Sequence, residues 1–256
     1  MSTPVDWQRY HAAIWRGRRQ AWRPVTALDP VRLDDLMAVD RQKQRLVDNT
    51  RRFLAGEPCN HALLWGSRGT GKSSLVKAVL NDLAADGLRL VEVDRDDLHW
   101  LPDIVDELRE QPFHFILFCD DLSFGDNTDD YRHLKSVLEG SIELPPPNVR
   151  LYATSNRRHL VPEFMDDNLQ ASNVGREIHH ADAVEEKIAL SDRFGLCLSF
   201  YPISEDDYFA IIDRLFPAVA DRDRLHVLAR RFSMEKGVRS GRTARQFHNQ
   251  FSDSFT

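Results

Sequence analysis

Cysteine is scarce in this chain, and no apolar run approaches the length of a membrane span. A bilayer-crossing helix needs about 18 apolar residues. The three cysteines, Cys59, Cys119 and Cys197, lie far apart and form no C-x-x-C pair. This spacing argues for reduced thiols and against a structural zinc site. The first residues lack a basic stretch followed by a long apolar one, so we expect no signal peptide. These absences predict a cytoplasmic protein that makes no membrane contact.

An excess of positive charge is missing too. The 256 residues include 34 Lys and Arg against 40 Asp and Glu, a formal net charge of −6. Bulk electrostatics therefore does not favour nucleic acid as a partner. The 42% hydrophobic and 29% charged fractions are typical of a soluble globular protein. The length suits one large domain or two small ones.

Residues 1–30 form an arm rich in tryptophan and arginine, which departs from this average composition. Its stretch DWQRYHAAIWRGRRQAWRP interleaves aromatic and basic side chains. Such a pattern can stack on bases and neutralise phosphates. Alternatively, Trp7, Tyr10, Ile14 and Trp15 form one apolar stripe of a helix that docks on the main body. We favour the docked helix.

Beyond the arm, short apolar runs alternate with amphipathic segments. We expect strands at 61–65, 88–94, 113–121, 150–156 and 196–202, and helices at 40–56, 71–86, 101–111, 130–140 and 182–194. Strands that alternate with helices indicate a parallel sheet covered on both faces. From residue 204 every segment looks helical. The sequence therefore predicts an α/β core over residues 31–202 and a small all-helical domain over residues 203–256.

The most specific motif is GSRGTGKSS, residues 66–74, which fits the phosphate-loop pattern G-x-x-x-x-G-K-[ST]. It follows an expected strand and opens an expected helix, which is the context that this motif requires. Glycines allow backbone N–H groups to wrap the phosphates, and the helix N-terminus favours an anion. Lys72 should reach the β- and γ-phosphates, and the Ser73 hydroxyl should bind Mg²⁺. The predicted ATP-binding residues of the loop are Gly66, Ser67, Arg68, Gly69, Thr70, Gly71, Lys72, Ser73 and Ser74.

Two adjacent acids end the strand FHFILFCDD. Ligands of open α/β sheets bind at the carboxyl edge, and there we expect this strand to lie beside the strand that precedes the phosphate loop. Asp120 would hold Mg²⁺ through water, and Asp121 would orient or deprotonate the attacking water. The alternative is a cap or turn, for which aspartate is also favoured.

The order of these motifs, followed by ATSN, LSDRFG and SGRTAR, resembles the AAA+ ATPases. In detail the chain is similar to a bacterial AAA+ family of unknown function, predicted to be ATPases. The stretches that carry this likeness include LLWGSRGTGKSSLVKA, LFCDDLSF and SGRTARQF, and it covers nearly the whole chain. The resemblance implies a five-stranded parallel P-loop (ASCE/AAA+) sheet flanked by helices and followed by a helical lid. The implied ligands are ATP or ADP and Mg²⁺.

The resemblance also implies roles for residues outside the loop. Asn156 matches sensor 1, whose amide would contact the γ-phosphate or the attacking water. Arg193 matches the arginine finger, which acts on a neighbouring subunit and so implies a homo-oligomer, a ring or a dimer. Arg245 best matches sensor 2, although Arg242, about one turn earlier, is an alternative. Adenine should lie near Met37 and Val39.

Two departures from the common AAA+ pattern affect the expected function. The acid strand ends in Asp-Asp rather than Asp-Glu, which shortens the base by roughly 1.5 Å and predicts slow hydrolysis. Trp100 and Leu101 precede Pro102 rather than a glycine, so a peptide-threading loop is weakly supported. We expect an ATPase that remodels or loads a partner, an unknown protein client. The alternatives are a nucleotide-gated binding switch with little turnover and, ranked lower, a nucleic-acid-associated ATPase that uses the arm.

Overall fold

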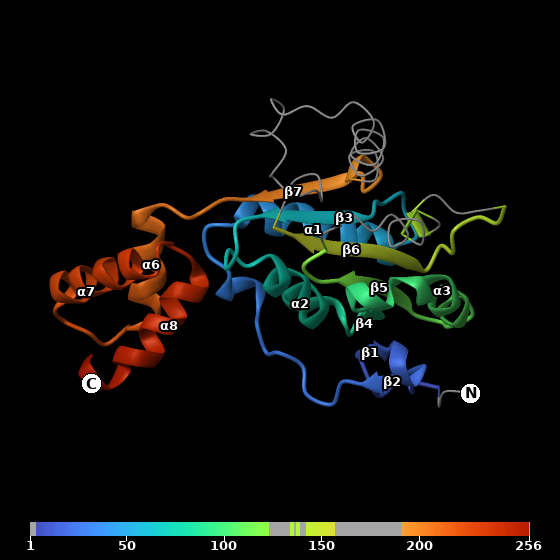
Figure 1. Ribbon diagram of the computed structural model, residues 1–256, viewed down its shortest axis with the longest axis horizontal. Helices are drawn as coiled ribbons and strands as arrows, with labels where there is room; N and C mark the ends of the chain where they lie inside the picture. The colour runs from blue at the N-terminus through green and yellow to red at the C-terminus, as the bar shows by residue number, and fades with distance from the viewer. Residues whose placement is uncertain (1–3, 123–133, 136, 139–141, 157–190, 256) are drawn as a thin grey trace, which may run out of the picture.

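The structure is a computed structural model, which describes residues 4–122, 134–135, 137–138, 142–156 and 191–255 (Figure 1). The helix expected at 130–140 lies largely outside these residues, as does most of the one expected at 182–194. No helix within the described ranges is long and apolar enough to cross a membrane.

The centre of the fold is a seven-stranded sheet in the order β2-β1-β4-β5-β6-β3-β7. The five expected parallel strands are confirmed as β3 (Ala62–Gly66), β4 (Leu88–Glu92), β5 (His114–Cys119), β6 (Val149–Ser155) and β7 (Leu196–Phe200). Both faces of the sheet are covered, and this is why β5 reads as an almost unbroken apolar run. Cys119 is buried, whereas Cys197, on the edge strand β7, is exposed.

Helices pack on both faces of this sheet (Figure 1). On one face, α1 (Asp40–Leu54) and α2 (Lys72–Leu83) bury Leu46 and Leu75 against Ile116 of β5. On the other face, α3 (Leu101–Arg109) buries Ile104 against Leu117 of β5. The short helix η3 (Arg95–Trp100) connects β4 to α3. The layers leave the carboxyl edge of the sheet open, and the lid lies at that edge (Figure 1).

The arm is not the helix that we expected. It forms a hairpin of β1 (Ala12–Arg16) and β2 (Ala21–Pro24), and β1 extends the sheet by pairing in parallel with β4. Trp15 lies opposite Trp22 across the hairpin, with ring centroids 4.9 Å apart. Cross-strand aromatic pairs stabilise a sheet, so the strand pairing outweighs the helical spacing of the apolar residues.

The tip of the hairpin is fixed by Gly17. Its backbone N–H donates to Asp97 Oδ2 at 2.9 Å, and a Cβ at this position would lie 2.0 Å from Asp97 Oδ1. Only glycine permits this close approach. The arm therefore docks on the main body, but as two strands, and its Trp7 and Trp15 side chains are 5% and 4% exposed.

The C-terminal segment is helical, as expected. It contains α6 (Glu205–Leu215), α7 (Arg222–Glu235) and α8 (Gly241–Phe251), followed by a short 3-10 turn. Each helix begins at a side-chain cap, Ser204, Asp221 or Ser240, which accepts a backbone N–H of the first turn. The three helices share a core of their own, centred on Tyr208, Ile212, Leu225, Ala229 and Phe247.

Candidate functional site

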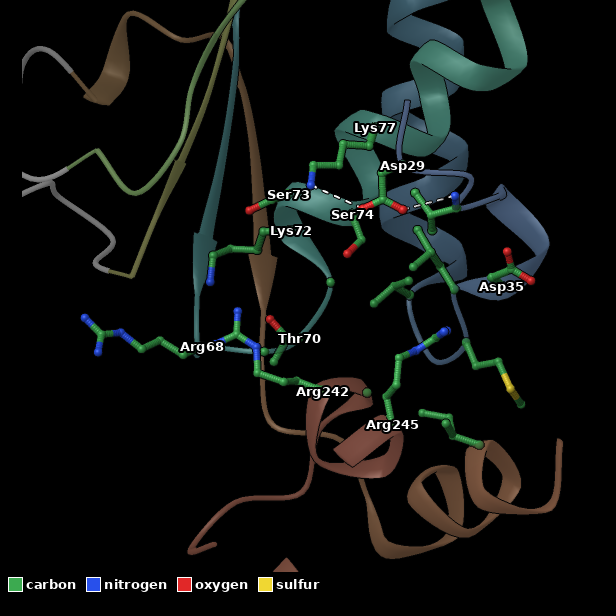
Figure 2. Close-up of a pocket in the computed structure, with 18 of the residues that line it drawn as sticks. Asp29, Asp35, Arg68, Thr70, Lys72, Ser73, Ser74, Lys77, Arg242 and Arg245 are labelled. Atoms are coloured by element: carbon green, nitrogen blue, oxygen red, sulfur yellow. Dashed lines mark hydrogen bonds and ion pairs between the residues drawn. The ribbon is translucent and has the colours of Figure 1, made fainter. Parts of the chain in front are cut away.

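A cleft of about 1050 Å³ lies between the carboxyl edge of the sheet and the helical lid (Figure 2). The core lines it with residues 68–74, with the ends of β5 and β6, and with the segment before α1. The lid lines it with parts of α6 and α8. The lining residues that matter below are Asp35, Met37, Val39, Asp120, Asp121, Thr154, Asn156, Arg214, Arg242 and Arg245.

The phosphate loop spans the turn from β3 to α2. Gly66 ends β3 with a φ of +130°, and a Cβ there would lie 1.9 Å from the Phe200 carbonyl oxygen of β7. Ser67 N donates to the same oxygen at 3.0 Å. Within the loop, the Thr70 hydroxyl donates to Ser67 O at 2.7 Å. These contacts fix the start of the loop against the neighbouring strand.

Lys72, the first residue of α2, is 7% exposed and reaches back along the loop. Its Nζ donates to Gly66 O at 2.7 Å, to Ser67 O at 2.8 Å and to Asn156 Oδ1 at 3.2 Å. All three acceptors lie at the open edge of the sheet. The ammonium is therefore held where an anion above the loop would meet it.

Electrostatics at the loop are mixed. Burial lowers the pKa of the Lys72 ammonium, the carboxylates of Asp121 and Asp120 act in the opposite direction, and Arg242 and Arg68 lower the pKa further. This excess of local positive charge favours an anionic ligand, because the bound anion would relieve the repulsion among Lys72, Arg242 and Arg68.

The acid pair lies close to the phosphate loop, but β5 is not the neighbour of β3 that we expected, because β6 lies between them. The acids still come near the loop, since the parallel strands end at one edge of the sheet. Ser73 Oγ donates to Asp120 Oδ1 at 2.6 Å, which brings the two predicted Mg²⁺ ligands together. Asn156 Nδ2 donates to Asp121 Oδ1, so Asn156 bridges Lys72 and Asp121. The chain turns sharply after β5, and Asp121 has a φ of 53°.

The two lid arginines point to different parts of the cleft. The backbone N–H of Arg242 approaches Gly69 O at 3.4 Å, and its side chain lies on the Thr70 and Lys72 side of the loop (Figure 2). Arg245 points into the cleft between Ser74 and Asp35, away from Lys72 (Figure 2). Only Arg242 of this pair acts on the pKa of Lys72.

Met37 and Val39 also line the cleft, on the segment that precedes α1. Lys43 Nζ donates to Leu36 O at 2.8 Å and holds this segment on α1. The lid contacts the same segment through Arg214 of α6, whose Nη1 donates to Asp34 O at 2.6 Å. Arg214 could not be identified from the sequence, because nothing in its local pattern distinguishes it from a surface arginine.

Arg193 lies just before β7 and does not line the described part of the cleft. Trp100 packs against Trp15, with ring centroids 5.9 Å apart. Together with the bond between Gly17 and Asp97, this contact fastens the connection after β4 to the hairpin.

The order of the five parallel strands, the phosphate loop and the lid define a P-loop ATPase module of the AAA+ class. The chain belongs to the family described as "Protein of unknown function (DUF815)", whose model matches residues 8–255.

Comparisons with solved structures support the fold. A variant of RuvB from Thermotoga maritima aligns with a TM-score of 0.50 and 16% identity over 87% of this chain and 72% of that one. The Orc1 protein of Aeropyrum pernix, solved in complex with DNA, aligns with a TM-score of 0.54 and 16% identity. The alignment covers 82% of this chain and 58% of the Orc1 chain.

A curated relative matches a shorter segment. The replication factor C large subunit of Ignicoccus hospitalis is 34% identical over 77 residues, which is 29% of this chain and 16% of that protein. The chain thus matches only a small part of that relative's length.

Proposed function

We propose that this protein binds ATP with Mg²⁺ in the cleft, hydrolyses it slowly, and uses the cycle to remodel or load a partner macromolecule. The observation that carries the proposal is the hydrogen-bonded set of Lys72, Ser73, Asp120, Asp121 and Asn156 beside the phosphate loop. Each of these side chains has the chemistry that one part of a triphosphate site requires.

Each residue of the proposed site has a role that follows from its position. Loop N–H groups and Lys72 hold the phosphates, and Asp121 orients or deprotonates the attacking water. The Ser73 hydroxyl and the Asp120 carboxylate are adjacent oxygen ligands of the kind that Mg²⁺ prefers. Bound there, Mg²⁺ would neutralise charge on the β- and γ-phosphates. The adenine would lie near Met37 and Val39.

For sensor 2, the geometry supports Arg242 over Arg245. Arg242 lies on the Lys72 side of the loop, where the terminal phosphates would bind, whereas Arg245 points toward the end near Asp35 (Figure 2). We therefore assign the phosphate contact to Arg242 and place Arg245 beside the sugar and base.

A nucleotide-gated switch with little turnover is the second candidate. Asn156 donates to the carboxylate of Asp121, so the candidate base is already engaged in the described state. The nucleic-acid alternative loses part of its support, since Trp7 and Trp15 are buried in the core and cannot stack on bases.

The proposed oligomer rests on Arg193. An arginine outside the described lining of its own cleft is suited to complete a neighbour's site, as trans-acting arginine fingers do. A ring or dimer in which each subunit offers Arg193 to the next would make hydrolysis depend on assembly.

Steady-state ATP hydrolysis against protein concentration tests the proposal. We expect specific activity to rise with concentration, and Arg193→Ala protein mixed into wild type to inhibit it. Arg52→Ala, at an exposed position on α1, is the matched control and should not inhibit. ATP binding without turnover would favour the switch, and failure to bind ATP would refute the proposal.

A further inference from the structure

Thr154 connects both acids of the proposed site, although neither the motifs nor the family resemblance assigns it a role. It lies on β6, between β5 and β3, and is 2% exposed while still lining the cleft. Asn156, two residues later, can be assigned from the sequence because it matches sensor 1. For Thr154 the sequence indicates only a residue that is favourable in a strand.

The hydroxyl of Thr154 makes two bonds at once. Its Oγ1 donates to Asp120 Oδ1 and accepts the backbone N–H of Asp121 at 2.9 Å. In addition, its carbonyl oxygen accepts the N–H of Leu122 at 2.7 Å. One residue of β6 therefore holds three consecutive residues at the end of β5.

These bonds control the direction of both carboxylates. Ser73 and Thr154 donate to the same oxygen of Asp120, so the rotation of that carboxylate is fixed from two sides. The N–H bond of Asp121 holds the backbone in the left-handed turn, φ 53°, which a non-glycine residue seldom adopts without support. Without this hydrogen bond the backbone turn would relax, and the Asp121 side chain would no longer point into the cleft.

We propose that Thr154 is a positioning residue, whose hydroxyl sets Asp120 for Mg²⁺ and the backbone turn that aims Asp121 at the attacking water. This inference rests on the proposed function. The simpler explanation is that the hydroxyl only satisfies buried polar groups and contributes to stability. The two explanations differ in what a hydroxyl-free variant does to Mg²⁺ dependence.

The variants Thr154→Val, Thr154→Ala and Thr154→Ser separate these explanations. Valine keeps the shape and removes the hydroxyl, alanine removes the hydroxyl and the methyl group, and serine keeps the hydroxyl alone. Each purified protein is compared with wild type in three measurements: thermal unfolding, hydrolysis kinetics, and calorimetric binding of a non-hydrolysable ATP analogue with and without Mg²⁺.

In the valine and alanine variants we expect kcat to fall by about ten- to a hundredfold, because a displaced acid loses its productive geometry. The gain in analogue affinity that Mg²⁺ provides to wild type should shrink by about tenfold in both. Binding without Mg²⁺ should stay within about threefold of wild type, since the phosphate loop is unchanged. Serine should restore both kcat and the Mg²⁺ effect.

Several results would overturn the inference. It fails if valine matches wild type in kcat and in Mg²⁺ dependence, or if serine is as impaired as valine, which would assign the effect to methyl packing. It also fails if neither hydroxyl-free variant folds, since the hydroxyl would then be structural. Failure of the proposed function shows separately, as wild type that does not bind the analogue at all.

Discussion

Replacing Gly69 by alanine tests whether the lid must rest on the phosphate loop for nucleotide to bind tightly. Gly69 has a φ of +78°, and an added Cβ would lie 2.9 Å from Ser240 Oγ and 3.2 Å from Arg242 Cβ. Ser240 cannot turn away freely, because its Oγ caps α8 by accepting the Thr243 N–H at 3.1 Å. The new methyl group must therefore push the start of α8 off the loop.

Two costs follow from this substitution, and they can be separated. The left-handed backbone costs an alanine about 1–2 kcal/mol in stability. Displacing α8 weakens the approach of Arg242 N to Gly69 O and the Ser240 cap, each worth about 0.5–1.5 kcal/mol. We expect the second cost, about 1–3 kcal/mol in total, to fall on the closed, nucleotide-holding state, which corresponds to about five- to 150-fold weaker ATP binding.

Gly237→Ala provides the matched control. Gly237 has a φ of +69°, but an added Cβ there meets nothing within 4 Å. Both variants should lose similar stability in thermal unfolding, and only Gly69→Ala should lose ATP affinity in calorimetric titration. Equal ATP affinity in the two variants would refute the view that the lid acts through this contact.

Three further predictions concern the cleft and the core. In calorimetric titration, Arg242→Ala should weaken ATP binding about tenfold more than ADP binding, whereas Arg245→Ala should weaken the binding of both nucleotides equally. The reverse pattern would assign sensor 2 to Arg245. Burial lowers the pKa of His61 to about 4, so as pH falls the imidazole is protonated in the unfolded chain before it is protonated in the folded protein. Up to about 3 kcal/mol of the free energy of unfolding is therefore lost between pH 7 and pH 4. Urea unfolding should show a flatter pH dependence for His61→Gln, and an unchanged slope would contradict the assignment. Arg89 is 4% exposed and donates to three backbone carbonyl oxygens, so Arg89→Met should lower the free energy of unfolding by about 2–4 kcal/mol in urea. The control Arg52→Met, at an exposed position, should lower it by less than about 0.5 kcal/mol, and an equally small loss for Arg89→Met would contradict the prediction.

The parallel core could be predicted because its signals are local. Each expected strand is a short apolar run, and the phosphate loop sits between a strand and a helix as its motif requires. Parallel strands end at one edge, so the proximity of Lys72, Asp121 and Asn156 follows from the strand pattern. Their chemical roles stay predictions.

The hairpin could not be predicted by the same method, because its apolar residues fit two periods. Trp7 and Trp15 lie eight residues apart, which suits a helical stripe, whereas the burial of Ala13 and Trp15 on one face of β1 follows the strand period of two. The better signal was the repeated WR pair around Gly17, which places Trp15 opposite Trp22. Tertiary pairing with β4 decides between the two.

The residues missed in the cleft share a different cause. Thr154 and Arg214 act through bonds to residues that are distant in sequence, Asp120 for the threonine and Asp34 for the arginine. No periodicity or spacing records such a bond. Residues of this kind become visible only when two strands, or the lid and the core, are placed side by side.

The hairpin also determines what the sheet presents to other proteins. Without it, β4 would be an edge strand with buried apolar neighbours, a ready template for pairing with another chain. The hairpin moves that edge outward to β2, which has only four residues, carries the exposed Arg23 and ends at Pro24. A short, charged strand that ends in proline offers few free donors to a second sheet. The tryptophan-rich arm therefore protects the core against edge-to-edge aggregation, independently of any part it plays in nucleotide chemistry.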